Sequence, residues 1–456
     1  MGGRNKYSSA GIPRHLCHQR SISLPEPSKM PLPCLCSRLS FLAISLFLFL
    51  TPTLQIPLVA PISKDPSSQL YTLNLFLKTP LQHTTLHLDL GSSLTWLLCD
   101  STYTSSSSHQ IPCNTSLCDS FPSKACSNNT CALFPENPLT RTTLLDTALI
   151  DSLALPSYDS SSQNPLVLIS NFIFSCAAAH LLQGLATNVA GLAALGRSNY
   201  SLPAQISTAL SSPRSFSLCL PASPNTGAAI FASTAISYFF SSKIDLTYTP
   251  LILNPVADTV VSHNSQPSDE YFINVTSIKI NGKALPINAS ILTVDETGFG
   301  GTKISTAEPY TVLESSIYKL LVQFFVNESS AFNLTATEAV EPFGVCYPAG
   351  DLTETRVGPA VPTVDLVMQS EEVFWRIFGG NSMVRTEKGG VDVWCLGFVD
   401  GGSRRRTAVV IGGHQLEDNV VQFDVESNIF GFSSSLLLQG AKCANLTLPN
   451  LTNRIS

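Results

Sequence analysis

The chain has 456 residues, too many for a single hydrophobic core, so we expect at least two domains. Charged residues make up only 13% of the chain, and the formal net charge is −6. Residues 1–55 carry six basic side chains and one acidic one, so the remainder is more acidic, at −11. This charge argues against nucleic acid and anionic membranes as partners.

The N-terminal residues indicate a leader rather than part of the fold. Residues 1–29 are polar and lack apolar periodicity, whereas Met30 is followed by Arg38 and the apolar run 39–50. A basic segment before a short apolar run is typical of a secretory signal peptide, and this run is too short to span a bilayer. We therefore interpret 30–57 as a signal peptide and 1–29 as a gene-model extension. The alternative is a genuine extension, such as a transit peptide.

Cysteine usage agrees with secretion. Ten cysteines follow the leader, and an even number in a secreted chain indicates up to five disulfides. A zinc site is the alternative, but no Cys-x-x-Cys remains and His is scarce near the cysteines, so we expect no metal and no cofactor. Nine sequons are candidates for N-glycosylation: Asn114, Asn128, Asn199, Asn274, Asn288, Asn327, Asn333, Asn445 and Asn450.

The stretch 86–98 predicts an apolar strand, a tight turn and a second apolar strand, and it follows an alternating strand at 70–77. The turn, Asp89-Leu90-Gly91-Ser92, places a carboxylate between the two strands. Asp often accepts backbone N–H bonds in turns, so a purely structural Asp is the alternative to a catalytic one. The next segments, 101–109 and 113–131, are rich in Ser, Asn and Cys, and we expect surface loops there.

Later segments continue the pattern of short strands. Strands are predicted at 172–176 and 216–220, and the Asn281-Gly282 pair is a strong hairpin signal. Pro, Ser and Asn concentrate between the two halves of the chain. We therefore divide the chain into a first lobe, 58–250, a linker, 251–270, and a second lobe, 271–456.

The motif Asp-x-Gly-Ser-x-Leu-x-Trp, which ends at Trp96, resembles the first active-site motif of plant pepsin-like aspartic proteases. Cys99 fits the same family, and the apolar-Gly segment 190–197 has a counterpart at 408–415, as in a duplicated fold. The resemblance covers about residues 70–443. It implies an all-β-dominated, bilobal double barrel with a few short helices. In that family two Asp share one proton and divide the acid and base roles.

Three departures from that family argue against catalysis. Leu90 replaces the family's Thr, whose hydroxyl ties the two active-site loops together. The segment 300–311 corresponds to the second active-site motif and puts Ser305 where the second Asp is expected. The family's flap should lie within residues 133–156, and no Tyr occurs in the stretch 134–143. We reject Asp295 as the second acid because two residues, not one, separate it from the next Gly.

Ser305 cannot take the role of a carboxylate. Its hydroxyl has a pKa far above neutrality, so it neither shares a proton with Asp89 nor takes one from water. A covalent role for Ser305 would need an adjacent base, and no His lies nearby in sequence, although triads can assemble from distant positions. We therefore expect no peptidase activity; an active aspartic endopeptidase is the main alternative.

Leu90, Ser305 and the run Gly-Thr-Lys-Ile-Ser-Thr narrow the resemblance to a non-proteolytic branch of the family. This branch includes basic 7S globulin-like proteins, xyloglucanase-inhibiting glycoproteins and cereal xylanase inhibitors, whose N- and C-terminal domain types would match the two lobes. The resemblance implies an extracellular or cell-wall protein of plant defence that blocks microbial glycoside hydrolases. It also implies that Cys346 pairs with Cys395. A storage or ligand-binding globulin is a further alternative.

In the inhibitors of this branch, a basic or imidazole side chain shortly before the last Cys enters the acidic cleft of the target. Glycosidases work with paired carboxylates, so a cation suits such a cleft. This chain has Gln439 or Gly440 at that place, and Lys442 follows late. The basic turn Arg404-Arg405-Arg406 is a candidate substitute, and an ordinary solvated loop is the alternative.

Overall fold

The computed structural model describes residues 57–100, 103–158, 165–222, 225–233, 240, 243–261 and 266–446. The predicted extension, residues 1–29, lies outside this part of the chain. So do residues 30–56 of the predicted signal peptide and the sequon at Asn450. The described residues all belong to one unit, residues 55–456. Within them, no helix is long and apolar enough to cross a membrane.

Strands dominate the N-terminal half. The first two strands are nearly continuous apolar runs, and almost all of their side chains are buried, as in strands that are covered on both faces. The strands are β1 (Leu58–Lys64), β2 (Tyr71–Leu77), β3 (Gln82–Asp89), β4 (Trp96–Leu98), β5 (His109–Gln110), β6 (Ala125–Ser127), β7 (Thr130–Leu133), β8 (Glu136–Asn137), β9 (Thr142–Thr143), β10 (Asp146–Pro156), β11 (Leu166–Ala177), β12 (Gly191–Ala194), β13 (Ser215–Cys219), β14 (Thr226–Phe231) and β15 (Thr247–Ile252).

The C-terminal half is built in the same way. Its strands are β16 (Tyr271–Ile273), β17 (Ser277–Ile280), β18 (Lys283–Ala284), β19 (Thr302–Ile304), β20 (Thr311–Leu313), β21 (Cys346–Pro348), β22 (Glu354–Thr355), β23 (Gly358–Pro359), β24 (Val364–Val367), β25 (Phe374–Ile377), β26 (Met383–Lys388), β27 (Val391–Leu396), β28 (Phe398–Asp400), β29 (Val409–Ile411), β30 (Val420–Asp424) and β31 (Ile429–Phe432). The hairpin signal at Asn281-Gly282 lies at the turn between β17 and β18, which pair antiparallel.

The two halves repeat one strand arrangement. In the first, β3 runs parallel to β12, β12 antiparallel to β4, and β4 parallel to β11. In the second, β19 runs parallel to β29, β29 antiparallel to β20, and β20 parallel to β28. In each repeat, a central strand (β12 or β29) pairs with the first strand (β3 or β19). The turn that follows the first strand therefore lies beside the end of the central strand. This arrangement puts the turns after β3 and after β19 in equivalent places.

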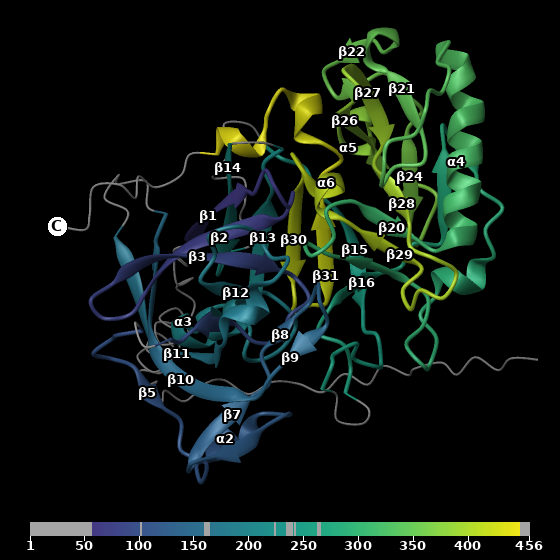
Figure 1. Cartoon of the computed structure of the whole chain (residues 1–456). Helices are drawn as coiled ribbons and strands as arrows, with labels where there is room; N and C mark the ends of the chain where they lie inside the picture. The colour runs from purple at the N-terminus through teal and green to yellow at the C-terminus, as the bar shows by residue number, and fades with distance from the viewer. Residues whose placement is uncertain are drawn as a thin grey trace, which may run out of the picture. The chain divides into compact units, whose positions relative to one another are not determined.

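Helices are few, which confirms the predicted β-dominated pepsin-like fold. The α-helices are α2 (Ser116–Ser120), α3 (Leu202–Leu210), α4 (Ser315–Ser329), α5 (Gly379–Ser382) and α6 (Gly413–Leu416). The longest, α4, begins where the Glu314 carboxylate accepts the N–H of Ser316 at 2.8 Å. Its residues Ile317, Leu321 and Phe325 recur every four positions and are buried. Figure 1 shows α4 on the outer side of the C-terminal strands.

The halves share strands, so they are not separated by a simple linker. From the C-terminal part of the chain, β30 pairs with β13 and β31 pairs with β15, and Figure 1 shows both yellow strands between the two sets. The boundary placed between residues 250 and 251 falls inside β15. The disulfide Cys219–Cys443 adds a covalent link between the same regions.

All ten cysteines that follow the leader form disulfides, as the even number predicted. Cys346 and Cys395 lie opposite each other on β21 and β27 and are bonded. The pairs are Cys99–Cys176, Cys113–Cys126, Cys118–Cys131, Cys219–Cys443 and Cys346–Cys395. The second and third pairs cross-link the Cys-rich loop at 113–131, where the sequence predicted a surface loop.

Candidate functional site

Asp89 ends β3, and only 2% of its surface is exposed. The parallel pairing of β3 with β12 sets Asp89 beside Ala194. The Ser92 hydroxyl donates to Asp89 Oδ2 at 2.5 Å. Burial raises the pKa of Asp89, whereas the bonds from Ser92 and the backbone, together with the charge of Lys303, act to lower it. The turn therefore holds a single buried carboxyl group in a fixed orientation.

Ser305 follows β19 in the position equivalent to Asp89. Its N–H donates to the carbonyl of Ile411 on β29 at 2.9 Å, and its Oγ accepts the N–H of Ala307 at 3.2 Å. Ser305 and Asp89 line one pocket with a volume of about 280 Å³. Among the described residues that line this pocket there is no His.

The two turns remain connected, and Thr306 makes the connection. The Thr306 hydroxyl accepts the N–H of Leu90 at 3.0 Å and donates to the carbonyl of Leu88 at 3.0 Å. The sequence predicted that this link is lost because Leu90 has no hydroxyl. That prediction is wrong. The loop after β19 still supplies a hydroxyl, that of Thr306, and this group makes both hydrogen bonds to the loop of Asp89.

The hairpin of β8 and β9 occupies the predicted flap position and carries no Tyr. The Trp96 Nε1 atom donates to the carbonyl of Glu136 at 2.9 Å, which fixes the start of the hairpin. The buried Asn137 side chain donates to the carbonyl of Leu181 at 2.7 Å. The hairpin is thereby anchored to the N-terminal half while its residues Glu136 and Arg141 line the pocket.

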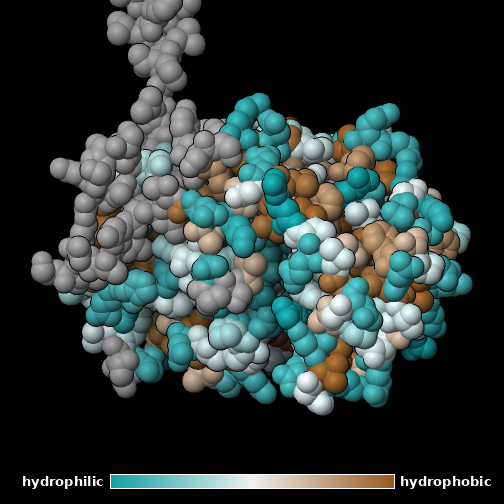
Figure 2. Space-filling view, turned by 90° about the horizontal axis from the view of Figure 1, so that it is seen from above, coloured by the Kyte–Doolittle hydropathy of each residue, from teal (hydrophilic) through white to brown (hydrophobic). Residues whose placement is uncertain are grey.

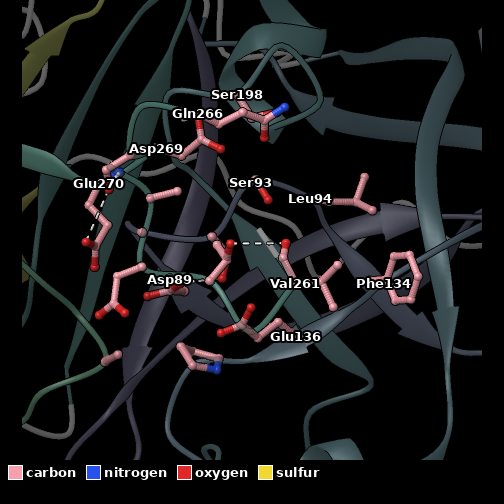
Figure 3. A pocket seen from close by; sticks show the side chains of 18 of the residues that line it. Asp89, Ser93, Leu94, Phe134, Glu136, Ser198, Val261, Gln266, Asp269 and Glu270 are labelled. Atoms are coloured by element: carbon pink, nitrogen blue, oxygen red, sulfur yellow. Dashed lines mark hydrogen bonds between the residues drawn. The ribbon is translucent and has the colours of Figure 1, made fainter. Parts of the chain in front are cut away.

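The pocket is rich in carboxyl groups. Figure 3 shows the side chains of Asp89, Glu136, Asp269 and Glu270 around it. Burial raises the pKa of Glu136, and it raises the pKa of Asp269 to about 6. Glu270 forms an ion pair with Lys303 at 2.5 Å. Burial thus favours the neutral form of three of these four carboxyl groups.

At equivalent positions, the two turns present one carboxyl group, that of Asp89, and one hydroxyl, that of Ser305. A hydroxyl does not share a proton with Asp89 as a second carboxyl group would. Of the other carboxyl groups that line the pocket, Glu136 lies on the flap and accepts the N–H of Val260 at 2.9 Å. Asp295 is exposed in a turn and accepts the N–H of Phe299 at 2.9 Å, and it does not line the pocket.

The basic turn is less available than the sequence predicted. The guanidinium of Arg405 pairs with Glu308 at 2.6 Å. The guanidinium of Arg406 donates to the carbonyl of Val256 at 3.0 Å. Arg404 is exposed and has no hydrogen bond or ion pair within the described part of the chain. Only Arg404 therefore remains a free cation in this turn.

The C-terminal candidates lie around a short 3₁₀ helix, Leu436–Gln439. Gln439 is exposed at its end, Gly440 closes it with a φ of 70°, and Lys442 is exposed before Cys443. Sequence reasoning missed Arg356, whose Nη1 donates to the carbonyl of Leu438 at 3.3 Å. Arg356 lies between β22 and β23, far away in the chain, and no sequence signal connects it with Gln439. The structure thus places a cation beside the candidate segment.

Seven of the eight described sequon asparagines are exposed, and Asn274 is half-buried. The exposed ones are Asn114, Asn128, Asn199, Asn288, Asn327, Asn333 and Asn445. Within the described ranges, no group of three or more His, Cys, Asp or Glu side chains is placed to hold a metal ion.

Comparison with protein families decides the assignment. Residues 71–232 match the xylanase inhibitor N-terminal family, and residues 270–434 match the xylanase inhibitor C-terminal family. The chain belongs to the xylanase-inhibitor family of pepsin-like proteins. Each matched segment contains one of the two equivalent turns, Asp89 in the first and Ser305 in the second.

Individual members of the xylanase-inhibitor family agree with this assignment. The chain is 80% identical over 428 residues to "Probable aspartic proteinase GIP1" of Glycine max, covering 93% of this chain and 99% of that one. The crystal structure of edgp superposes with a TM-score of 0.82 at 45% identity, covering 86% and 98% of the two chains. Basic 7S globulin from soybean superposes with a TM-score of 0.72 at 32% identity, covering 86% and 100%.

Proposed function

We propose that the protein is a secreted, catalytically silent inhibitor of microbial cell-wall glycoside hydrolases. The observation that carries this proposal is Ser305 at the place of the second acid, in a fold that keeps both turns and the pocket between them. A fold that retains its architecture without its proton-sharing pair is suited to binding rather than to hydrolysis. The family match to xylanase inhibitors supports a hydrolase as the partner.

The docking surface of this proposal is the C-terminal 3₁₀ helix with Arg356 beside it. Leu438 is 45% exposed there, and Gln439 and Arg356 are exposed as well. An apolar side chain next to an exposed guanidinium that forms no ion pair with the described residues suits the cleft of a glycosidase, where two carboxyl groups flank the bond that is cut. Arg356 supplies the cation that Gln439 does not. Figure 2 shows hydrophobic residues interspersed with hydrophilic ones on the face in view.

Secretion is part of the proposal. Five disulfides support it, because disulfides form and persist in oxidising compartments. The exposed sequons are accessible to glycosylation, which takes place on the same route. Mass spectrometry of the protein recovered from plant extracellular fluid tests both points, through the N-terminus and through the occupied asparagines.

Inhibition assays against a fungal xylanase and a fungal xyloglucanase test the main claim. We expect the mature protein to inhibit at least one of them, and Arg356→Ala to weaken inhibition by about tenfold or more, since one charge-assisted contact is lost. Arg385→Ala is the matched control, because Arg385 is also an exposed arginine of the C-terminal half but is paired with Asp392. Absence of binding to both enzymes at micromolar concentration would reject the proposal.

An aspartic endopeptidase is the second candidate. It is favoured by the intact Asp89 turn and by the name of the Glycine max relative. Digestion of haemoglobin at acid pH that pepstatin stops would select it. A storage globulin, the third reading, would show neither inhibition nor digestion.

A further inference from the structure

The segment between the two lobes folds back on itself at the edge of the pocket. Ala257 N–H donates to the carbonyl of Gln266 at 2.7 Å, and Ser268 N–H donates to the carbonyl of Asn254 at 2.9 Å. These bonds bring the two arms of the segment together. Residues from both arms, including Asp258 and Gln266, line the same pocket as Asp89. The segment is therefore a wall of the pocket rather than a loose connection.

The first arm of this segment is bonded to the flap. Arg141 Nη1 donates to the carbonyl of Asp258 at 2.6 Å, and Arg141 Nη2 donates to its Oδ1 at 3.0 Å. The Glu136 carboxylate accepts the N–H of Val260 at 2.9 Å and lies 3.6 Å from Arg141 Nη1. The flap therefore makes three hydrogen bonds to this segment, and two of them involve a single residue, Arg141.

The same arm is also bonded to the C-terminal lobe. The guanidinium of Arg406 donates to the carbonyl of Val256 at 3.0 Å and lies 4.0 Å from Asp258 Oδ1. The buried Asn254 side chain donates to the carbonyl of Gly298 at 3.1 Å. Asp258 thus lies between a guanidinium of the flap and a guanidinium of the opposite lobe. The contacts form a continuous chain from the flap to the C-terminal lobe.

The backbone conformation of Arg141 indicates that its side chain has a specific role. Arg141 has a φ of 55°, in the left-handed region that favours Gly or Asn. The Cβ atom of most residues crowds the backbone in this conformation, a cost that Gly avoids and that Asn offsets by local hydrogen bonds. The hydrogen bonds to Asp258 are a physical reason for an arginine at this point.

We propose that Arg141 and Asp258, with Glu136 and Val260, form a latch that holds the flap closed over Asp89 and excludes extended polypeptides from the pocket. The flap of a pepsin-like enzyme must open to admit substrate. Here the inter-lobe segment ties the flap to the opposite lobe instead. The latch closes the pocket by contacts that are independent of the substitution at Ser305, and it lies apart from the docking surface around Arg356.

Hydrogen exchange of the mature chain, followed by mass spectrometry, tests the latch. In Arg141→Asn, which suits the left-handed turn but lacks the guanidinium, we expect amides of 134–145 to exchange about five- to tenfold faster. Asp258→Asn should give a smaller increase, because the bond to its carbonyl remains. The double variant should exchange little faster than Arg141→Asn, because Arg141→Asn already removes the bond to the Asp258 carboxylate, and Asp258→Asn then affects only the longer contact with Arg406 at 4.0 Å. Lys124→Ala, which breaks the exposed pair with Asp119 in the same half, should leave these amides unchanged.

Labelling of Asp89 with a water-soluble carbodiimide and an amine gives a second readout. Asp89 should react faster in Arg141→Asn than in the unmodified protein, by a factor similar to that for exchange. Unchanged exchange at 134–145 together with unchanged labelling, in a variant whose β1 and β2 amides exchange as before, would overturn the proposal. Additive effects of the two substitutions would also overturn it, because they would show that Arg141 and Asp258 act separately.

Discussion

The hydroxyl of Thr306 accepts the backbone N–H of Leu90, and this bond crosses from the second turn to the first at 3.0 Å. The same hydroxyl donates to the carbonyl of Leu88. Thr306 is fully buried. One side chain therefore satisfies main-chain groups on both sides of Asp89 and keeps the two turns in register.

Thr306→Val tests how much this contact contributes. Valine has the same shape but lacks the hydroxyl, so a buried N–H and a buried carbonyl lose their partner. We expect a loss of about 2–4 kcal/mol in the free energy of unfolding, measured by urea denaturation. Thr306→Ser keeps the hydroxyl and should lose much less. Equal losses in the two variants would show that the methyl group, not the hydroxyl, matters.

We expect Ser305→Asp alone not to create a normal peptidase. The substitution places a carboxyl group on the turn equivalent to that of Asp89, but the flap still lacks a Tyr and stays bonded to the segment at Asp258. General acid–base catalysis accounts for about 10²–10⁴ in rate per group, and loss of positioning adds to this. The measurement is haemoglobin digestion at acid pH, with Asp89→Asn in the same background as the control. Full activity of Ser305→Asp would mean that the second acid is the only part missing.

Part of the site could be predicted from the sequence. Asp89 and Ser305 each follow a short apolar strand at a tight turn, so local pattern and the internal repeat locate both. The contact between Arg141 and Asp258 could not be predicted, because it joins two irregular segments 117 residues apart whose path depends on tertiary packing. Thr306 was available as the residue after Ser305, but sequence reasoning considered only the hydroxyl that Leu90 lacks.

His87 makes the fold sensitive to acid. Its side chain is fully buried, and neither ring nitrogen has a hydrogen-bond partner among the residues that the structure describes. Burial lowers the pKa of His87 from 6.5 to about 4. A base with a lowered pKa in the folded state contributes stability above the unfolded pKa and loses it as the pH falls through the folded value. We therefore expect stability to decline between pH 6.5 and 4.

His87→Leu should remove this part of the decline. The shift in pKa corresponds to a contribution of up to about 3 kcal/mol between pH 6.5 and pH 4. Urea denaturation at pH 7 and at pH 4 gives the difference for each protein. His109→Leu is the control, because His109 is exposed. An equal decline in His87→Leu and the unmodified protein would contradict the prediction.

Asp269 gives the opposite pH dependence. Burial raises its pKa from 3.8 to about 6, although Arg214 and Arg197 attract the charged form. A raised pKa in the folded state contributes stability that is present below pH 3.8 and is lost as the pH rises through about 6. Asp269→Asn should therefore stabilise the fold at pH 7.5 by about 1–3 kcal/mol and have little effect near pH 4. Destabilisation at pH 7.5 would show that the charged form is favoured by the two arginines.

The disulfide between Cys219 and Cys443 joins two residues 224 positions apart and so closes a large ring in the chain. The ring contains the inter-lobe segment, Ser305 and the turn at Arg404. A single cut in the backbone anywhere inside it opens the ring without releasing a fragment. A protein nicked in this region by a microbial protease would run as two bands on a reducing gel and as one on a non-reducing gel. Its two halves, which also share the pairing of β13 with β30, would stay together as one particle after the cut.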